Sequence, residues 1–205
     1  MPTPTERVRA CERSKIRVMF DLAEAADRDL VRLEVGEPDF DTPEHIIDAA
    51  ADAARAGETH YTSNAGMAEL REAIAETLDR DYDVSYDPEQ YVVTNGGMEA
   101  LHLAILSTVG PGEELLLPSP SWPNYWAQAR LADAEPVEIP MPEESGYALD
   151  ADRVIDRMSA DTGAVILCSP ANPTGSCTTP TRSARSSTPR PSTTRTCSPT
   201  RCISD

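Results

Sequence analysis

Two spacings of apolar residues alternate along the first 175 residues and predict the order of helices and strands. Apolar positions three or four residues apart indicate amphipathic helices, whereas short continuous apolar runs indicate buried strands. The helical spacing occurs over residues 6–28, 44–56, 66–80, 97–109, 122–131 and 150–158. The strand-like runs lie at residues 31–35, 91–94, 114–117, 137–139 and 164–168. Because such strands alternate with helices, we expect an α/β fold with a mostly parallel sheet covered on both faces.

Local signals at two helix ends support these boundaries. Thr42-Pro43-Glu44 offers a capping hydroxyl, a proline in the first turn and an acidic residue near the positive helix end. Gly57 is suited to end that helix, and Asp150 to cap the helix that follows it. The sequence therefore predicts helix starts near Pro43 and after Asp150, and a helix end at Gly57.

The hydrophobic pattern stops after Gly175. Residues 177–205 are mainly Thr, Ser, Pro and Arg, a composition that cannot bury a core, so we expect a disordered tail. Codons chosen freely for residues 178–187 and read one base earlier can encode Tyr-Asp-Ala-Asp-Thr-Leu-Arg-Glu-Ile-Val, the start of an amphipathic helix. We therefore favour a frameshifted tail, with a natural disordered linker as the alternative, and the nucleotide sequence decides between them.

The charge of the chain is strongly negative, at −17. Residues 177–205 carry five Arg and one acid, which leaves 13 basic and 34 acidic residues, a net of −21, in residues 1–176. Only Lys15 among these basic residues is a lysine. This balance disfavours nucleic acid as a partner. An acidic, lysine-poor surface also indicates a halophilic protein, with an ordinary acidic cytoplasmic protein as the alternative.

Membrane and metal sites are not expected either. No apolar run approaches the roughly 20 residues needed to span a bilayer, and the N-terminus has no signal-peptide core, so we expect a cytoplasmic protein. The five cysteines, at 11, 168, 177, 197 and 202, form no C-x-x-C pair and are expected to be free thiols. The three histidines have no ligand spacing with them, so no metal site is predicted.

Three segments at the ends of predicted strands carry candidate chemistry. Gly96-Gly97 joins a strand to a helix, where free N–H groups and the positive helix end suit a phosphate. Trp122 follows the next strand and is placed to stack on a flat ring. Asn172 follows a third strand, fixed between prolines. Taken singly, each has a plain structural alternative, respectively a glycine turn, a core tryptophan and a β-turn.

Jointly, these segments describe a pocket for a phosphorylated heteroaromatic cofactor, and the chain resembles the class I/II aminotransferases. These are the aspartate aminotransferase-like, pyridoxal-phosphate-dependent enzymes of fold type I. The order and spacing of the matching pieces fit over residues 30–176. These pieces are Gly36-Glu-Pro-Asp-Phe-Asp-Thr-Pro43, Tyr61, Gly66-Met-Ala-Glu-Leu-Arg71, Thr94-Asn-Gly-Gly-Met-Glu-Ala100, Trp122 and Ser169-Pro-Ala-Asn-Pro-Thr-Gly175.

The resemblance implies a role for each matching residue. Gly96, Gly97 and Met98 would hold the phosphate of pyridoxal 5′-phosphate, and Trp122 would stack on its ring. Asn172 would bind the ring hydroxyl and help hold the substrate carboxylate. Further contacts are implied for Gly36, whose backbone would meet the substrate, and Tyr61, which would reach the partner's cofactor phosphate across a homodimer interface; an ordinary packed tyrosine is the alternative for Tyr61.

The resemblance also implies a domain division. Residues 1–44 would be an N-terminal arm and the start of a small domain. Residues 45–176 would be part of the large cofactor domain, an incomplete three-layer αβα sandwich, followed by the tail at 177–205. The intact enzyme would exchange an amino group between an amino acid and a 2-oxo acid.

The chain does not supply the family's catalytic lysine, which forms a Schiff base with the cofactor. Lys15 lies outside every matching motif, so no catalytic residue is assigned and we expect this polypeptide to be inactive. Two alternatives remain open. One is a fragment of a carbon–sulfur lyase of the same fold, and the other is a non-catalytic protein that pairs with a full-length homologue.

Overall fold

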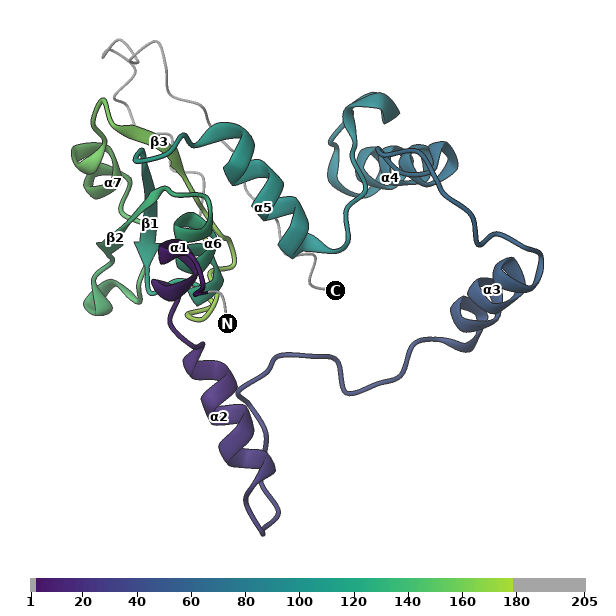
Figure 1. The fold of residues 1–205 in the computed structure, drawn as a ribbon, viewed down its shortest axis with the longest axis horizontal. Helices are drawn as coiled ribbons and strands as arrows, with labels where there is room; N and C mark the ends of the chain where they lie inside the picture. The colour runs from purple at the N-terminus through teal and green to yellow at the C-terminus, as the bar shows by residue number, and fades with distance from the viewer. Residues whose placement is uncertain (1–2, 179–205) are drawn as a thin grey trace. The chain divides into compact units, whose positions relative to one another are not determined.

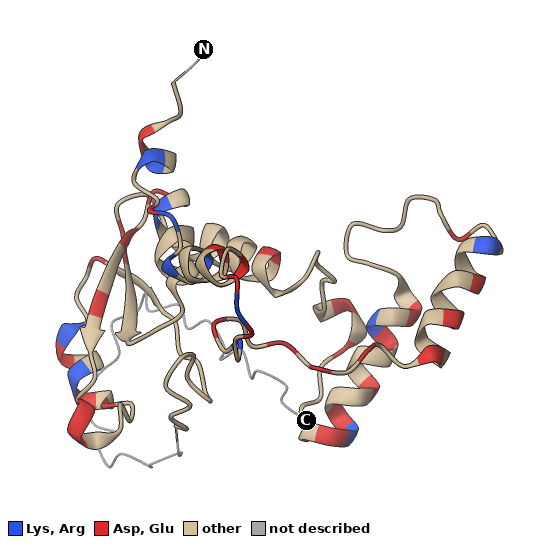
Figure 2. Ribbon diagram, turned by 90° about the horizontal axis from the view of Figure 1, so that it is seen from below, with Lys and Arg blue, Asp and Glu red and all other residues tan. Residues whose placement is uncertain are grey.

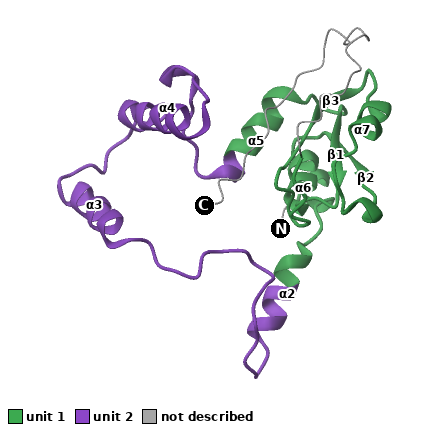
Figure 3. Cartoon of the chain, turned by 180° about the vertical axis from the view of Figure 1, so that it is seen from behind, with its two compact units in different colours: residues 1–18, 100–205 green, residues 19–99 purple. Residues whose placement is uncertain are grey.

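The computed structural model describes residues 3–178, so residues 179–205 of the predicted tail lie outside the described residues (Figure 1). The chain divides into two units, drawn in different colours in Figure 3. One unit consists of residues 1–18 and 100–205, and the other of residues 19–99. Each unit is described by itself.

A three-stranded parallel sheet forms the centre of the first unit (Figure 1). Its strands are β1 (Glu114–Ser119), β2 (Glu135–Pro140) and β3 (Thr162–Val165), in the order β2-β1-β3. Leu116 at the middle of β1 lies opposite Val137 of β2 and Val165 of β3. The prediction of an α/β fold with a parallel sheet is therefore confirmed.

Alternate leucines of β1 fill the two faces of this sheet. Leu115 and Leu117 belong to one core cluster, with Ile105 from α5 (Gly97–Thr108) and Ala129 from α6 (Pro123–Leu131). The intervening residue of β1, which points to the opposite face, belongs to a second cluster with β2 and α7 (Ala151–Arg157). All three leucines of β1 are at most 1% exposed. Burying each such side chain stabilises the fold by about 1.5–3 kcal/mol relative to exposure.

The helix predicted over residues 6–28 is wrong as a single element. The structure has α1 (Glu6–Arg9) and α2 (Lys15–Glu24) in its place. At the break, Arg7 Nη1 of α1 lies 2.7 Å from Oδ2 of Asp133, which follows α6. Cys11 Sγ, just after α1, lies 3.3 Å from the carbonyl oxygen of Arg7 and 3.7 Å from that of Ala127 in α6. These contacts outweigh the helical spacing of the local sequence.

The unit of residues 19–99 contains α3 (Glu44–Arg55), α4 (Ala68–Tyr82) and a short 3₁₀ turn η1 (Pro88–Gln90). The strands predicted at 31–35 and 91–94 do not form among the described residues, so both predictions are wrong. A strand needs a neighbour to pair its backbone groups. The second segment has one backbone hydrogen bond to another segment, in which Val93 N donates to Ala65 O (3.0 Å).

The helix ends agree with the sequence in two cases of three. Gly57, with φ +95°, follows the end of α3 as predicted. Asp150 caps α7, since its Oδ1 accepts from the backbone N–H of Arg153 at 3.1 Å. Thr42, in contrast, is not a cap: the residue before α3 is Pro43, and no side-chain hydrogen bond caps that helix.

Acidic residues are spread along α3 and α4 (Figure 2). Within residues 3–178, none of the helices is long and apolar enough to cross a membrane. A second 3₁₀ turn, η2 (Glu143–Ser145), follows β2 and leads into the loop before α7.

Candidate cofactor site

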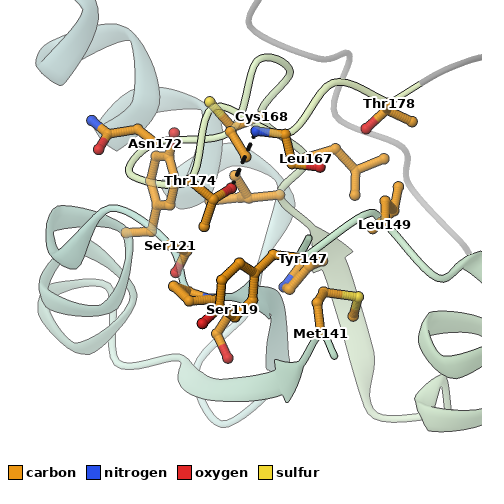
Figure 4. Close-up of a pocket in the computed structure, with 16 residues that line it drawn as sticks. Ser119, Ser121, Met141, Tyr147, Leu149, Leu167, Cys168, Asn172, Thr174 and Thr178 are labelled. Atoms are coloured by element: carbon orange, nitrogen blue, oxygen red, sulfur yellow. Dashed lines mark hydrogen bonds between the residues drawn. The ribbon is translucent and has the colours of Figure 1, made fainter. Parts of the chain in front are cut away.

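A pocket opens where the three strands of the sheet end (Figure 4). Its walls come from residues 118–121 at the end of β1 and directly after it, from Met141, Tyr147 and Leu149 after β2, from several residues between 166 and 178 after β3, and from Tyr125 of α6. The carboxyl ends of parallel strands meet at one edge of a sheet, and ligands bind there in open α/β folds. The position of this pocket is therefore that of a ligand site.

Hydroxyl groups from two of these segments face the pocket. They belong to Ser119 at the end of β1, to Ser121 after it and to Thr174 and Thr178 after β3, and Tyr147 adds a ring from the loop after β2 (Figure 4). Ser176 also lines the pocket. The space open to the centres of water-sized groups is ≈ 40 Å³. The pocket therefore presents hydroxyl groups and one aromatic ring to a ligand at the ends of the strands.

Asn172 lies on a tight turn at the rim of this pocket. The backbone N–H of Gly175 donates to Ala171 O (2.7 Å), and that of Ala171 donates to Ser176 O (2.8 Å). Gly175 has φ +70°, which glycine adopts without strain. The side-chain amide of Asn172 is exposed and points outward in Figure 4. The turn therefore presents a donor and an acceptor that the described residues leave available.

Trp122 lies at the start of α6, directly after the pocket residue Ser121. Its ring meets that of Tyr125 edge to face, with centroids 5.5 Å apart and an interplanar angle of 88°. Tyr125 is buried and lines the pocket, whereas Trp122 is half-buried. Trp122 also packs against the core cluster of the sheet, so it is a packing residue that keeps part of its surface exposed.

The second tryptophan of the segment has a different role. The guanidinium of Arg130 lies 4.8 Å from the centroid of the Trp126 ring. The same guanidinium holds both carboxylate oxygens of Glu135, at 2.6 and 2.9 Å. Trp126 is thus part of a structural contact between α6 and β2.

The glycine loop of the candidate phosphate site belongs to the unit of residues 19–99. Gly96 has φ +81°, its backbone N–H donates to Thr94 O (2.8 Å), and α5 begins at the next residue. A Cβ atom on Gly96 or Gly97 would meet nothing within 4 Å. The loop therefore leaves open space before the positive end of a helix, as an anion site requires.

Glu99 already uses part of that positive end. Its Oε2 accepts a short hydrogen bond from the backbone N–H of Asn95. Met98, the third predicted phosphate residue, is 42% exposed. A phosphate bound here would share the loop with the Glu99 carboxylate, and the remaining N–H groups would have to bind it.

Gly36 and Tyr61 are both open to contacts from outside their unit. A Cβ atom on Gly36 would meet nothing within 4 Å, and Tyr61 is fully exposed. Their predicted contacts with substrate and with a partner's cofactor remain predictions.

Two of the predicted site residues are thus at the pocket: Asn172 lines it, and Trp122 contacts Tyr125, which lines it. The other predicted residues, Gly36, Tyr61, Gly96, Gly97 and Met98, belong to the unit of residues 19–99. The sequence did not single out Ser119, Tyr147 or Ser176. Ser119 is the last residue of β1, so its position at a strand end was the available signal. Tyr147 comes from an irregular loop, and its sequence offers no such signal.

Known proteins match most of this chain. The family model for aminotransferase class I and II matches residues 28–182. A bifunctional aspartate aminotransferase and glutamate/aspartate-prephenate aminotransferase from Petunia hybrida is 42% identical over 173 residues, which are 83% of this chain and 36% of that protein. An aspartate aminotransferase from Pyrococcus horikoshii is 40% identical over 170 residues, which are 83% of this chain and 43% of that protein.

A solved structure gives the same result. The aspartate aminotransferase from Thermus thermophilus with maleate matches with a TM-score of 0.81 and 38% identity, over 88% of this chain and 48% of that one. The chain spans less than half the length of each of these proteins. By its sequence and its fold, the chain belongs to the class I and II aminotransferases.

Proposed function

We propose that residues 1–176 are the N-terminal portion of an enzyme that, when intact, transfers an amino group between an amino acid and a 2-oxo acid. The observation that carries the proposal is the pocket at the strand ends, which has Asn172 on its rim and Tyr125, with Trp122 against it, in its wall. The match of residues 28–182 to the aminotransferase family supports it.

The described residues fit pyridoxal 5′-phosphate as the cofactor. The open space at Gly96 and Gly97, at the start of α5, suits its phosphate, and the indole of half-buried Trp122 suits its ring. In this proposal the backbone of residues 96–98 binds the phosphate, and Trp122 packs on the ring. When bound, the cofactor supplies the electron sink for chemistry at the α-carbon of the amino acid.

Two further groups orient the reactants. The Asn172 amide donates to the ring hydroxyl and helps hold the substrate carboxylate, which its exposed position on the turn permits. The backbone of Gly36 contacts the substrate. Tyr61, which is fully exposed, reaches the cofactor phosphate of the second subunit in a homodimer. The arm and start of the small domain comprise residues 1–44, and residues 45–176 belong to the large domain.

The 205 residues alone do not complete this chemistry. Proton transfer at the substrate's α-carbon needs a basic amine close to the cofactor, and Lys15, the only lysine of the sequence, lies in α2 outside the motifs. We therefore assign this polypeptide a cofactor- and substrate-binding part of the enzyme and no catalytic residue.

Binding of pyridoxal 5′-phosphate to the purified 205-residue protein tests the proposal. We expect the cofactor to quench tryptophan fluorescence, with the quench lost in Trp122→Phe and kept in the matched control Trp126→Phe. No keto acid should form from any amino acid. Turnover by this polypeptide would refute the absence of a catalytic group, and quenching that depends on Trp126 alone would refute the site.

A second candidate is a non-catalytic protein that pairs with a full-length homologue. The observation in its favour is that no described residue of 19–99 is buried, although α3 and α4 have apolar faces. Co-expression with a tagged full-length aminotransferase of the same family distinguishes the candidates. Co-purification in fixed stoichiometry would support pairing, and its absence would leave the first proposal.

The tail and the charge carry two narrower proposals. We assign residues 177–205 to an altered reading frame, which a nucleotide sequence without an open alternative frame would refute. We also propose that the protein works in the cytoplasm at high salt. Its net charge of −17 and the acidic side chains along exposed α3 and α4 (Figure 2) support the adaptation to salt. Concentrated potassium chloride should then raise its unfolding midpoint, and an unchanged or lower midpoint would oppose this.

A further inference from the structure

Two thiols flank the turn that carries Asn172. Cys168 is half-buried just after β3, and Cys177 is exposed on the returning arm of the turn. Both are free thiols in the structure. Only eight residues separate them, and these residues include the whole Asn-Pro-Thr-Gly segment.

Hydrogen bonds hold the two arms of this turn side by side. The backbone N–H of Ala171 donates to Ser176 O (2.8 Å), and that of Thr178 donates to Ser169 Oγ (2.8 Å). Residue 171 is therefore paired with 176, and 169 with 178. This pairing places Cys177 opposite Pro170.

The thiol of Cys168 already reaches toward that position. Its Sγ donates to the carbonyl oxygen of Pro170 at 3.1 Å, and Pro170 is the residue opposite Cys177. Cys177 Sγ lies 3.8 Å from the carbonyl oxygen of Gly175. Neither contact is strong, since a thiol is a weak donor. A disulfide between them would require both side chains to rotate and the two arms to bring the α-carbons within the usual range of about 4.4–6.8 Å.

Cys11 differs from Cys168 and Cys177 in the surroundings of its thiol and in its distance along the chain from another cysteine. Its Sγ lies between two carbonyl oxygens where α1 packs against α6. No hydrogen-bonded turn joins it to a second cysteine within the part of the chain that the structure describes. It serves as an internal reference for the pair at the turn.

We propose that Cys168 and Cys177 form a reversible disulfide that closes the Asn172 turn covalently. The oxidant is a low-molecular-weight disulfide such as oxidised glutathione. The thiolate of exposed Cys177 attacks one of its sulfurs and releases one glutathione thiolate. The thiolate of Cys168 then attacks the mixed disulfide at the Cys177 sulfur and releases the second. Two electrons pass to the oxidant, and the protons of both cysteines end on two molecules of reduced glutathione.

The consequence concerns the presentation of Asn172. A bond between residues 168 and 177 restricts the turn that holds this amide at the rim of the pocket. That consequence rests on the proposed role of Asn172 in binding the cofactor, whereas the thiol chemistry does not. The disulfide proposal can therefore be refuted while the aminotransferase proposal stands. Equally, the aminotransferase proposal can be refuted while the disulfide proposal stands.

Peptide mapping of the full 205-residue protein tests the bond directly. The protein is equilibrated in glutathione buffers of graded ratio, alkylated and digested with trypsin. Cys168 and Cys177 fall within one tryptic peptide, residues 158–182, whereas Cys197 and Cys202 fall in others. The bond appears as peptide 158–182 without either alkyl group. We expect half-oxidation at a glutathione ratio about tenfold more reducing than for the same protein in guanidinium chloride.

A pair of serine variants tests the geometry. Ser169→Ala removes the acceptor that joins the arms and should lower the tendency to oxidise by about threefold. The matched control Ser107→Ala, whose hydroxyl donates within α5 to Ala104 O, should change nothing. Equal oxidation in native and denaturing buffer would overturn the proposal. So would a dithiol peptide at every ratio, or preferential cross-linking of either thiol to peptides with Cys197 or Cys202.

Discussion

The two units of this chain differ in whether they enclose their own core. Every buried apolar residue that the structure describes lies between Ile105 and Ala164, around the three-stranded sheet. No described residue of 19–99 is buried, although that unit contains two of the longer helices. A sheet with helices on both faces buries apolar surface within one unit. Helices joined by extended segments leave their apolar faces for other surfaces to cover.

This difference agrees with the coverage of the relatives. The chain aligns with less than half of each of the three proteins compared above. Ile46 and Ile47 on α3 are 50% and 52% exposed, and Leu70 on α4 is 45% exposed. We expect these faces to contribute little to the stability of this polypeptide. The strand-and-helix unit should therefore set its unfolding free energy.

The largest expected effect comes from paired leucine substitutions in the two units. Leu116→Ala empties a site that is fully buried between the strands and α7, and should cost about 2–5 kcal/mol of unfolding free energy. The matched variant Leu70→Ala, on exposed α4, should cost no more than about 0.5 kcal/mol. Urea unfolding followed by circular dichroism measures both. Equal losses would mean that residues 19–99 enclose a core of their own.

Sequence reasoning succeeded where local pattern and tertiary contacts agree. The apolar run at 114–117 became the central strand, and Asp150 caps α7, because each signal depends on nearby residues. It failed at 31–35, where Val31 and Leu33 are 88% and 85% exposed. An apolar run predicts a strand only if a neighbouring strand is present to pair with it.

The candidate site shows the same limit. Trp122 and Asn172 were predictable because each follows a strand end, where a motif also lies. Tyr147 enters the pocket from an irregular loop, so only the folded chain reveals it. The break between α1 and α2 was equally hidden, since the contacts beside it reach α6 and the residues just after it, more than 100 residues away, as Arg7 does with Asp133.

A second pair of variants compares the two units at glycines. A Cβ atom on Gly163 would lie 2.7 Å from Glu113 Oε2 and 2.9 Å from Val109 Cγ1. Gly163→Ala should therefore lower the unfolding free energy by about 1–3 kcal/mol. Gly97→Ala, at the start of α5, meets nothing within 4 Å and should not destabilise. Thermal unfolding of both proteins measures the difference, and an unaffected Gly163→Ala protein would show that the sheet edge is loosely packed.

The smallest expected effect is a pH dependence of the sheet unit. The guanidinium of Arg157 donates to both carboxylate oxygens of Glu114, at 2.8 and 3.1 Å. These hydrogen bonds are the main cause that lowers the pKa of Glu114 below its ordinary value of 4.5, and partial burial opposes them. Because the folded pKa is depressed, the stabilisation is fully present above about pH 4.5 and is lost as the pH falls through the folded value.

Solvent limits the size of this term, since the Glu114 and Arg157 side chains are 19% and 41% exposed. We expect Glu114→Gln to lower the unfolding free energy by about 1 kcal/mol or less at neutral pH, with a difference from the unmodified protein that shrinks in acid. Urea unfolding at a series of pH values measures it. The matched control is Asp52→Asn, which removes the exposed pair with Arg55 in residues 19–99 and should have no effect at any pH. If both variants behaved alike, the ion pair at the base of the sheet would be no better ordered than one on an exposed helix, and the contrast between the units would not extend to their charges.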